Sequence, residues 1–242
     1  MLYLGSIACK AILNNKNRII NCLYIDSTKK DRNTKYIISL ASKKNIKIKY
    51  ITKDIIYKLT NSKTTGGIFI DALPINYPNT IKNITNIKDN IIFFIQGVED
   101  PFNLGYTLRT LYAFGFNTIM INHYHFNDND HIIVKSSAGA SEYMNIILSD
   151  NINDDIKYLN SLNYHMLLMN RSNNSIDYTK YDYSNKKLVI AIGGEKRGLS
   201  KILYNLSKEQ LYIPYYNDFK NALSVSSSVI CIASEIKRQL NK

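Results

Sequence analysis

Cysteine is scarce in this chain of 242 residues, and its arrangement argues against two kinds of structural site. Cys9, Cys22 and Cys231 show no C-x-x-C spacing and no partnering histidines, which disfavours a disulfide framework and a zinc site. His123 and His125 would share one face of a strand, but no carboxylate trio or cysteine lies near them in the sequence. We therefore expect no metal, and a reducing compartment, the cytoplasm, fits best.

Long apolar runs are also absent. No run approaches the ~18 apolar residues that a membrane span requires. The short apolar start has no basic leader and is interrupted early by Lys10. We expect no membrane segment.

Two glycine fingerprints of nucleotide-binding enzymes are missing as well. The dinucleotide motif G-x-G-x-x-G must sit between the first strand and the first helix of a βαβ unit. After the apolar stretch at 91–95, the glycines are Gly97 and Gly105, which do not match. A phosphate-binding G-x-x-x-x-G-K-[ST] loop is absent too. These absences disfavour the common dinucleotide and nucleoside triphosphate enzymes.

Positive charge, in contrast, is abundant. Lysine and arginine number 31 against 19 aspartates and glutamates, a net charge of +12. Such an excess favours a polyanionic partner, because neutralised phosphates release counterions. Asparagine, isoleucine, lysine and tyrosine are frequent everywhere, however, so a biased coding composition explains the charge equally well. Composition alone leaves nucleic-acid binding open.

The order of helix and strand patterns indicates two α/β domains. Residues 1–72 alternate short strands and helices as a small α/β sandwich, in which Lys47 and Lys49 would share one face of a strand, as an RNA-facing or merely solvated edge. Residues 73–90, with Pro74 and Pro78, are polar and predict a linker. Residues 91–242 open with a continuous apolar strand, typical of a buried parallel sheet, and then alternate helices with strands. A mostly parallel sheet follows from that order.

Three separated segments of the second domain have a pattern of their own. Glu99-Asp-Pro-Phe-Asn-Leu-Gly-Tyr-Thr-Leu-Arg109 opens a helix that Gly115 follows. Leu188-Val-Ile-Ala-Ile-Gly-Gly-Glu-Lys-Arg-Gly-Leu199 is a buried-type strand that ends at paired glycines, where a ligand can approach the backbone. Tyr212-Ile-Pro and Asn221-Ala-Leu-Ser-Val-Ser226 lead into the last helix. In this order the segments resemble the three motifs of the SpoU/TrmH family of RNA methyltransferases.

This resemblance implies a fold and a function. The fold is the SPOUT α/β domain, a mostly parallel sheet whose C-terminal part forms a trefoil knot, one of the rare exceptions to unknotted chains. The function is S-adenosylmethionine-dependent 2′-O-ribose methylation of rRNA or tRNA by a homodimer with its cofactor sites at the subunit interface. Residues 1–72 resemble, more weakly, the small RNA substrate-binding domain that often precedes the catalytic domain.

Matched position by position, the motifs give a set of site residues. The resemblance assigns catalysis to Asn103, Arg109, Glu195 and Ser224, and cofactor binding to Gly193, Gly194, Gly198, Ile213 and Leu223. Each has a plainer alternative: Asn103 as a helix cap, Arg109 as a surface arginine, Glu195 as a solvated carboxylate, and Ile213 and Leu223 as core residues. The stretch 136–142 also resembles the family, with a helix end stopped by glycine as its alternative.

The third motif departs from the usual Ser-Leu-Asn-Val-Ser. Ala222 stands at the usual serine and Ser224 at the usual asparagine, although the adjacent Asn221 could compensate. This departure keeps a non-catalytic RNA-binding protein open as an alternative. Base methylation on the same scaffold is another, against which Asn103 and Arg109 argue, since they mark the ribose branch. In either methylation the guanidinium of Arg109 stays protonated, so we interpret it as an electrostatic stabiliser and phosphate clamp.

Overall fold

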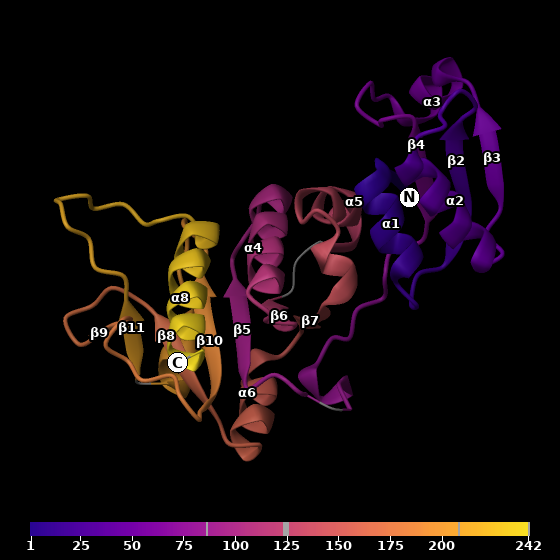
Figure 1. Ribbon diagram of the computed structural model, residues 1–242. Coiled ribbons are helices and arrows are strands. Elements are labelled where there is room, and N and C mark those ends of the chain that lie inside the picture. Colours follow the sequence, from indigo (N-terminus) through magenta and orange to yellow (C-terminus); the bar gives the residue numbers. More distant parts are fainter. Residues whose placement is uncertain (86, 123–125, 208, 242) are drawn as a thin grey trace. The chain divides into compact units, whose positions relative to one another are not determined.

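The computed structural model describes residues 1–85, 87–122, 126–207 and 209–241 and divides into two compact units (Figure 1). The first unit combines Met1–Asn76 with His125–Tyr143, and the second combines Tyr77–Tyr124 with Met144–Lys242. The sequence had predicted a division into 1–72, 73–90 and 91–242. The structure differs in that it groups a segment from the middle of the chain with the N-terminal residues.

The first unit is built on a four-stranded mixed sheet of order β1-β4-β2-β3. Its elements are β1 (Leu2–Leu4), α1 (Ser6–Asn14), β2 (Ile20–Asp26), α2 (Arg32–Lys43), β3 (Ile48–Ile51), α3 (Lys53–Thr60), β4 (Ile68–Ala72), α5 (Phe126–Ser136) and the 3-10 helix η2 (Ala140–Tyr143). Strand β2 is parallel to β3 and antiparallel to β4. The predicted small α/β domain is therefore present, with the three-residue β1 as an addition that the sequence did not indicate.

Helix α2 shows how sequence sets the local structure here. The side chain of Asp31 accepts a hydrogen bond from the backbone N–H of Thr34 at 3.0 Å and so caps the helix. Thr34, Ile37 and Ala41 recur at helical spacing and are buried. The isoleucine and the alanine join residues of α1 and the sheet in one hydrophobic core.

Helix α5 joins the same core through Val134. Behind its last turn Gly139, with φ of 80°, donates its backbone N–H to the carbonyl of Val134 at 2.8 Å. A Cβ on Gly139 would lie 2.5 Å from the Cβ of Ala11, so only glycine allows this approach to α1. The stretch 136–142 thus ends a helix and packs against α1.

A buried ionic cluster fixes this packing. Arg18 contacts the carboxylate of Asp130 at 2.7 Å, and its Nε donates to Glu142 at 3.0 Å. All three side chains are fully buried. The hydroxyl of Tyr3 donates to Asp130 at 2.6 Å, and burial together with this carboxylate raises the pKa of the Tyr3 phenol. Burial alone would lower the pKa of Arg18, but the hydrogen bonds that it donates to Glu142 and Asp130 raise it.

The second unit contains a seven-stranded sheet of order β7-β6-β5-β10-β8-β11-β9, and all its strand pairs are parallel. Its elements are η1 (Ile81–Asn83), β5 (Ile91–Gln96), α4 (Pro101–Ala113), β6 (Thr118–Asn122), β7 (Asn145–Ser149), α6 (Ile152–Ser161), β8 (Tyr164–Met169), β9 (Ile176–Asp177), β10 (Lys187–Gly193), α7 (Lys201–Leu206), β11 (Gln210–Tyr212) and α8 (Val225–Leu240). The predicted parallel-sheet α/β domain is confirmed. The two-residue β9 and the six-residue α7 were not predicted.

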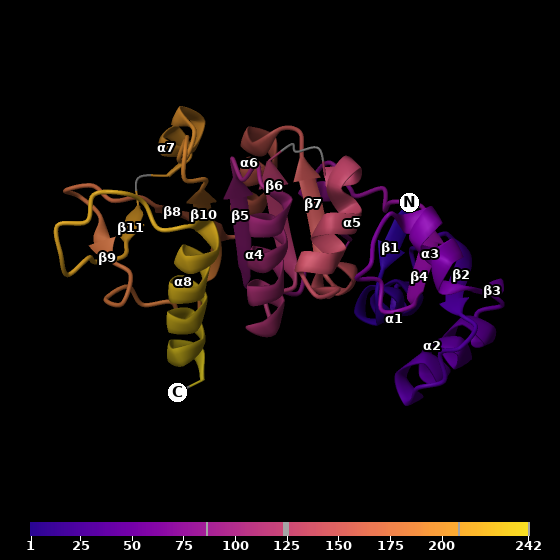
Figure 2. The ribbon, with the colours of Figure 1, turned by 90° about the horizontal axis from the view of Figure 1, so that it is seen from above.

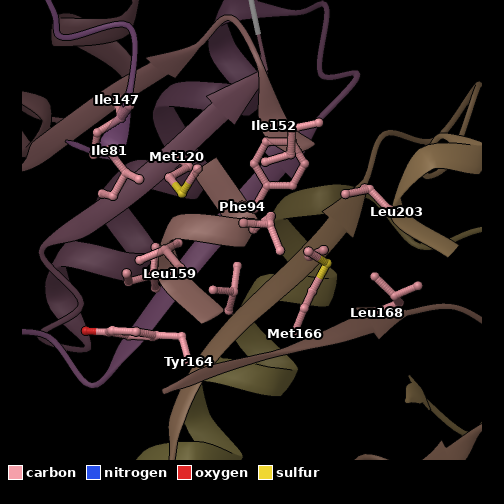
Figure 3. Close-up of a cluster of buried hydrophobic side chains, with 14 residues drawn as sticks. Ile81, Phe94, Met120, Ile147, Ile152, Leu159, Tyr164, Met166, Leu168 and Leu203 are labelled. Carbon is pink, nitrogen blue, oxygen red and sulfur yellow. The ribbon is translucent and has the colours of Figure 1, made fainter. Parts of the chain in front are cut away.

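Helices cover both faces of this sheet (Figure 2). Helices α4 and α8 lie side by side on one face, and α6 and α7 lie on the other. On the α6 side, Phe94, Met120 and Met166 pack with Leu159 and Leu203 in a hydrophobic cluster (Figure 3). Alternate strand residues point to the opposite face, which explains why the strands are apolar throughout.

The segment expected as a linker is held along this unit. Asp155 accepts hydrogen bonds from the hydroxyl of Thr80 and, at 3.1 Å, from the backbone N–H of Ile81. Ile81 itself is fully buried in the hydrophobic cluster. The hydroxyl of Tyr164 donates to the carbonyl of Asp89 at 2.6 Å. This segment is therefore ordered, although its polar composition predicted a linker.

The Arg18 cluster generates a stability prediction. Arg18→Ala leaves two buried carboxylates without their cation, and breaking a buried ion pair on one side costs about 3–5 kcal/mol. Urea unfolding of the full chain, followed by circular dichroism, should show a loss of that size. The exposed Arg32→Ala should change stability by less than about 0.5 kcal/mol. An equal, small effect of both substitutions would contradict the assigned role of the cluster.

Candidate functional site

Two clefts meet at the carboxyl ends of β5 and β10, which are neighbours in the sheet with Gly193 opposite Gln96. Ligands of open parallel sheets bind in the crevice outside the carboxyl ends of the strands. This edge is therefore the expected place for a ligand in the second unit.

The larger cleft has a volume of about 290 Å³. It lies among the ends of β8, β10 and β11 and the segment that precedes α8. The residues that the sequence predicted for this region and that line it are Gly193, Gly194, Glu195, Gly198, Ile213 and Leu223. The structure thus gathers all five predicted cofactor positions, which span about thirty residues of the chain, around one cleft.

The smaller cleft, of about 130 Å³, lies beside the first. Its lining includes Gly97, Asp100 and Asn103, together with Gly194 and Glu195, which both clefts share. Two of the predicted catalytic residues, Asn103 and Glu195, therefore face one space. Glu195 is exposed and stands where the two clefts join.

Steric contact explains the paired glycines. A Cβ on Gly194 would lie 2.1 Å from the carbonyl oxygen of Gly97, and one on Gly193 would lie 2.4 Å from the carbonyl carbon of Gly198. All these neighbouring atoms belong to the backbone and cannot rotate away. Gly194 also donates its N–H to the carbonyl of Gln96 at 2.7 Å. The glycines are thus needed so that two loops of this chain can touch, whatever else they contact.

Gln96 is a supporting residue that the sequence analysis missed. Its side-chain oxygen accepts the backbone N–H of Ser200 at 2.6 Å and ties the glycine turn to the end of β5. The available signal was a polar residue at the end of an otherwise apolar strand.

Helix α4 presents Asn103 and Arg109 differently. Asp100 caps the helix by accepting from the backbone N–H groups of Phe102 and Asn103, at 3.2 and 3.1 Å. Asn103 is therefore not the cap, and it lines the smaller cleft. Arg109 lines neither cleft; it is exposed, six residues further along the helix, on a stripe with exposed Phe102 and Tyr106.

The segment between β11 and α8 is held by residues that the motifs did not include. The hydroxyl of Tyr215 accepts the backbone N–H of Leu223 at 3.0 Å. The guanidinium of Arg171 lies 4.5 Å from the centre of the Tyr215 ring, and its Nη1 donates to the carbonyl of Phe219 at 3.4 Å. Arg171 and Tyr215 both line the larger cleft. Arg171 lies 48 residues from Phe219 in the sequence and Tyr215 lies eight residues from Leu223, and no sequence motif indicated either contact.

Ser224 occupies the N-cap of α8, which begins at Val225. Its Oγ accepts the backbone N–H of Ser227 at 3.1 Å and contacts the hydroxyls of Ser226 and Ser227. This hydroxyl is already engaged in capping. Asn221 and Ala222 line the larger cleft next to it.

The described residues include no group of three or more histidine, cysteine, aspartate or glutamate side chains that could hold a metal ion. His123 and His125 lie outside the described residues. Within the described part of the chain, every helix is too short or too polar to cross a membrane.

Comparison with known families identifies the family to which the chain belongs. Residues 90–234 match the SpoU rRNA Methylase family, and residues 4–78 match the domain described as RNA 2'-O ribose methyltransferase substrate binding. The chain belongs to the SpoU rRNA methylase family. It is thus an enzyme of the RNA methyltransferase class, as its three motifs predicted.

Individual relatives and structures agree with the family. A protein of Borreliella burgdorferi named an uncharacterized tRNA/rRNA methyltransferase is 29% identical over 224 residues, which cover 88% of this chain and 96% of the relative. A putative TrmH family tRNA/rRNA methyltransferase of Staphylococcus saprophyticus is 26% identical, with coverage of 92% and 89%. The crystal structure of the SpoU methyltransferase AviRb from Streptomyces viridochromogenes in complex with AdoMet has a similar fold, with a TM-score of 0.82 at 15% identity, covering 100% of this chain and 91% of that one.

The glycine contact predicts a difference between two alanine variants. Gly194→Ala pushes a Cβ into the carbonyl of Gly97 and should cost about 3 kcal/mol or more of unfolding free energy. Gly198→Ala meets no atom within 4 Å and only forces alanine to φ of 60°, at about 1–2 kcal/mol. Thermal or urea unfolding of both variants measures this order. A smaller loss for Gly194→Ala than for Gly198→Ala would disprove the steric explanation.

Proposed function

We propose that this enzyme transfers a methyl group from S-adenosylmethionine to a ribose 2′-hydroxyl of an rRNA or a tRNA. The observation that supports the proposal most directly is the pair of adjoining clefts at Gly194 and Glu195. One cleft serves the methyl donor and the other the acceptor ribose, with Glu195 at their junction.

The larger cleft fits S-adenosylmethionine in its chemistry. Leu199, Leu211, Ile213 and Leu223 give it apolar walls, while the ends of β10 and β11 present backbone N–H and C=O groups that can recognise an adenine and a ribose. Gly193, Gly194 and Gly198 shape the turn on its other side. The sulfonium of S-adenosylmethionine supplies a methyl group that is already activated for displacement.

The protein's own residues then contribute position and charge. Asn103 and Glu195 orient the acceptor ribose in the smaller cleft, which aligns the 2′-hydroxyl with the methyl group. Arg109 stabilises the alkoxide that develops when the hydroxyl loses its proton and binds a neighbouring phosphate. A guanidinium stays protonated, so Arg109 is not assigned the role of proton acceptor.

Arg109 acts across a homodimer interface in this proposal. It lies outside both clefts of its own chain, on the α4 stripe with Phe102 and Tyr106, which are about half exposed. An exposed aromatic stripe is typical of a surface that a partner covers. In a two-fold dimer this stripe brings Arg109 to the clefts of the partner chain. The C-terminal segments form the trefoil knot of the family, and dimerisation completes the site.

The substrate proposal includes the first unit and the cellular location. Residues 4–78 match a substrate-binding domain, and the net charge of +12 favours a polyanion. Cys9, Cys22 and Cys231 are free thiols, in keeping with the cytoplasm, where rRNA and tRNA are found.

Arg109→Ala tests the proposal. Loss of an electrostatic stabiliser should lower the rate of methyl transfer about a hundredfold to a thousandfold, while the affinity for S-adenosylhomocysteine stays within about twofold, since Arg109 lies away from that cleft. Incorporation of labelled methyl into total RNA from cells that lack the gene measures the first, and calorimetry the second. The control is Lys157→Ala on α6, an exposed cation on the other face of the sheet.

Mixed dimers test whether Arg109 acts across the interface. A variant that blocks the larger cleft, Ile213→Glu, and Arg109→Ala are each expected to be inactive. Co-folded, they should recover about a quarter of the wild-type activity, because half of the dimers then contain one intact composite site. No recovery would place Arg109 in the site of its own chain. Failure of the wild type to methylate any RNA while it binds RNA and S-adenosylhomocysteine would favour the non-catalytic alternative.

Ser224 is tested by two substitutions. Ser224→Ala removes the α8 cap and should cost about 1 kcal/mol of stability, whereas Ser224→Asn keeps a capping side chain and restores the longer amide of the usual motif. Single-turnover rates should fall with alanine and stay equal or rise with asparagine. A loss of about 0.5–1.5 kcal/mol in activation free energy corresponds to one hydrogen bond, and a larger loss to a contact made in the transition state. Unchanged rates in both variants would leave Ser224 with the capping role alone.

A further inference from the structure

A large cavity lies in the first unit, within residues 26–67, and the methyl-transfer chemistry leaves it unused. Its volume is about 710 Å³, well inside the range of about 300–1,000 Å³ for small-ligand sites. Strands β2 and β3 are parallel, with Asp26 opposite Ile51 at their carboxyl ends, and the cavity opens there. Crevices at this end of parallel strands are common ligand sites.

Three lysines surround the cavity: Lys29, Lys53 and Lys63. The side chain of Lys53 is 80% exposed, and its ion pair with Asp26 is long, at 4.0 Å. Asp26 is itself buried and is satisfied locally, because its carboxylate accepts from the backbone N–H and the hydroxyl of Thr28, at 3.0 and 2.9 Å. Lys29 is paired with Asp31 at 3.0 Å, whereas Lys53 and Lys63 remain available to an anion from outside.

Backbone groups add to the same rim. Gly66 has φ of 59° and no atom within 4 Å of the place of a Cβ, so the chain there is open to a ligand. The first turn of helix α3 also lines the cavity. Thr52 occupies the N-cap position, but its side chain makes no capping hydrogen bond, so N–H groups of the first turn are available. Both features favour a phosphate near the lysines.

Another part of the lining suits a base. Tyr57 on α3 is 46% exposed and lines the cavity next to the buried Ile56. An exposed aromatic ring beside a basic rim is the usual platform for an unstacked nucleobase. Asp54, on the same helix, can accept a hydrogen bond from an exocyclic amino group.

From this combination we propose that the cavity binds one unpaired nucleotide of the substrate RNA, with its base on Tyr57 and its phosphate at Lys53 and Lys63. The inference rests on the proposed function only in taking RNA as the ligand. In this proposal the first unit recognises an unpaired nucleotide in an RNA helix, such as a bulged or flipped one, and is more than a general basic surface.

Binding of two RNA hairpins to the full chain tests the inference. The hairpins are identical except for one bulged adenosine, and fluorescence anisotropy measures their affinities. The wild type should prefer the bulged hairpin by between about fivefold and a hundredfold, the range expected for one base stacked on an aromatic ring. Tyr57→Ala should abolish this preference and leave the affinity for the paired hairpin unchanged. The matched control is Tyr36→Ala on α2, whose ring is 47% exposed and does not line the cavity.

The lysines are tested by the salt dependence of binding. Lys53→Ala and Lys63→Ala should each reduce the slope of log affinity against log salt by about 0.7–0.9, the value for one lost phosphate contact. Lys58→Ala, on α3 but outside the cavity, should reduce neither that slope nor the preference for the bulge. Equal binding of both hairpins by the wild type would overturn the inference. So would a Tyr57→Ala variant that behaves like Tyr36→Ala, or tight binding of free adenosine 5′-monophosphate, which would indicate a small-molecule site.

Calorimetry with S-adenosylhomocysteine separates this inference from the proposed function. All the cavity variants should bind it as the wild type does, because the cavity belongs to the other unit. If the wild type prefers the bulged hairpin but shows neither cofactor binding nor methyl transfer, the proposed function fails and the nucleotide site stands. If methyl transfer is present without any preference for the bulge, the nucleotide site alone is rejected.

Discussion

Contact between two stretches of bare backbone, at Gly97 after β5 and Gly194 after β10, is the constraint on which the site depends. Because no side chain intervenes, the carboxyl ends of two adjacent buried strands come within van der Waals distance of each other. Gln96 strengthens the contact by accepting from the backbone of Ser200. The two clefts adjoin at this contact, because Gly194 and Glu195 line both of them. The position of the site is therefore determined by the strand order and by the glycines, and the polar side chains are placed around it.

A different force holds the first unit together. Helix α5 and η2 are attached to the N-terminal residues by a hydrophobic contact at Val134 and by the charges around Arg18. Ion pairs of this type contribute little net stability when complete and a large penalty when incomplete. They therefore specify which segments associate more than how strongly they do so. In the second unit, segments are held together by the packing of apolar strands and by hydrogen bonds to Asp155 and Asp89.

The sequence predicted those parts of the fold whose signal is local. The apolar strands at 91–95 and 188–192, the helix after Asp100 and the glycine turn could be recognised because periodicity and glycine pairs are visible within a few residues. The packing of α5 with the N-terminal residues was not predicted, because Asp130 is of a residue type that is usually exposed and its burial depends on Arg18. Tyr215 and Arg171 escaped for a related reason, since their roles are defined by backbone groups that folding brings near them. Gly193 and Gly194 lie at the turn that the sequence predicted after the strand, and the structure adds a steric reason for them.

The buried charges also set a rule for anyone who divides this gene. A fragment that begins at residue 91 would keep Asp130 and Glu142 and lose Arg18, so the cut that domain boundaries suggest would pass through an ionic cluster. Replacing Asp130 and Glu142 with apolar residues of similar size would remove the cost of burying two carboxylates without a cation, since apolar substitutes for complete buried ion clusters are tolerated well. A recombination event that exchanged the N-terminal domain would face the same requirement. A protein that arose from such an exchange would therefore need substitutions at Asp130 and Glu142 first.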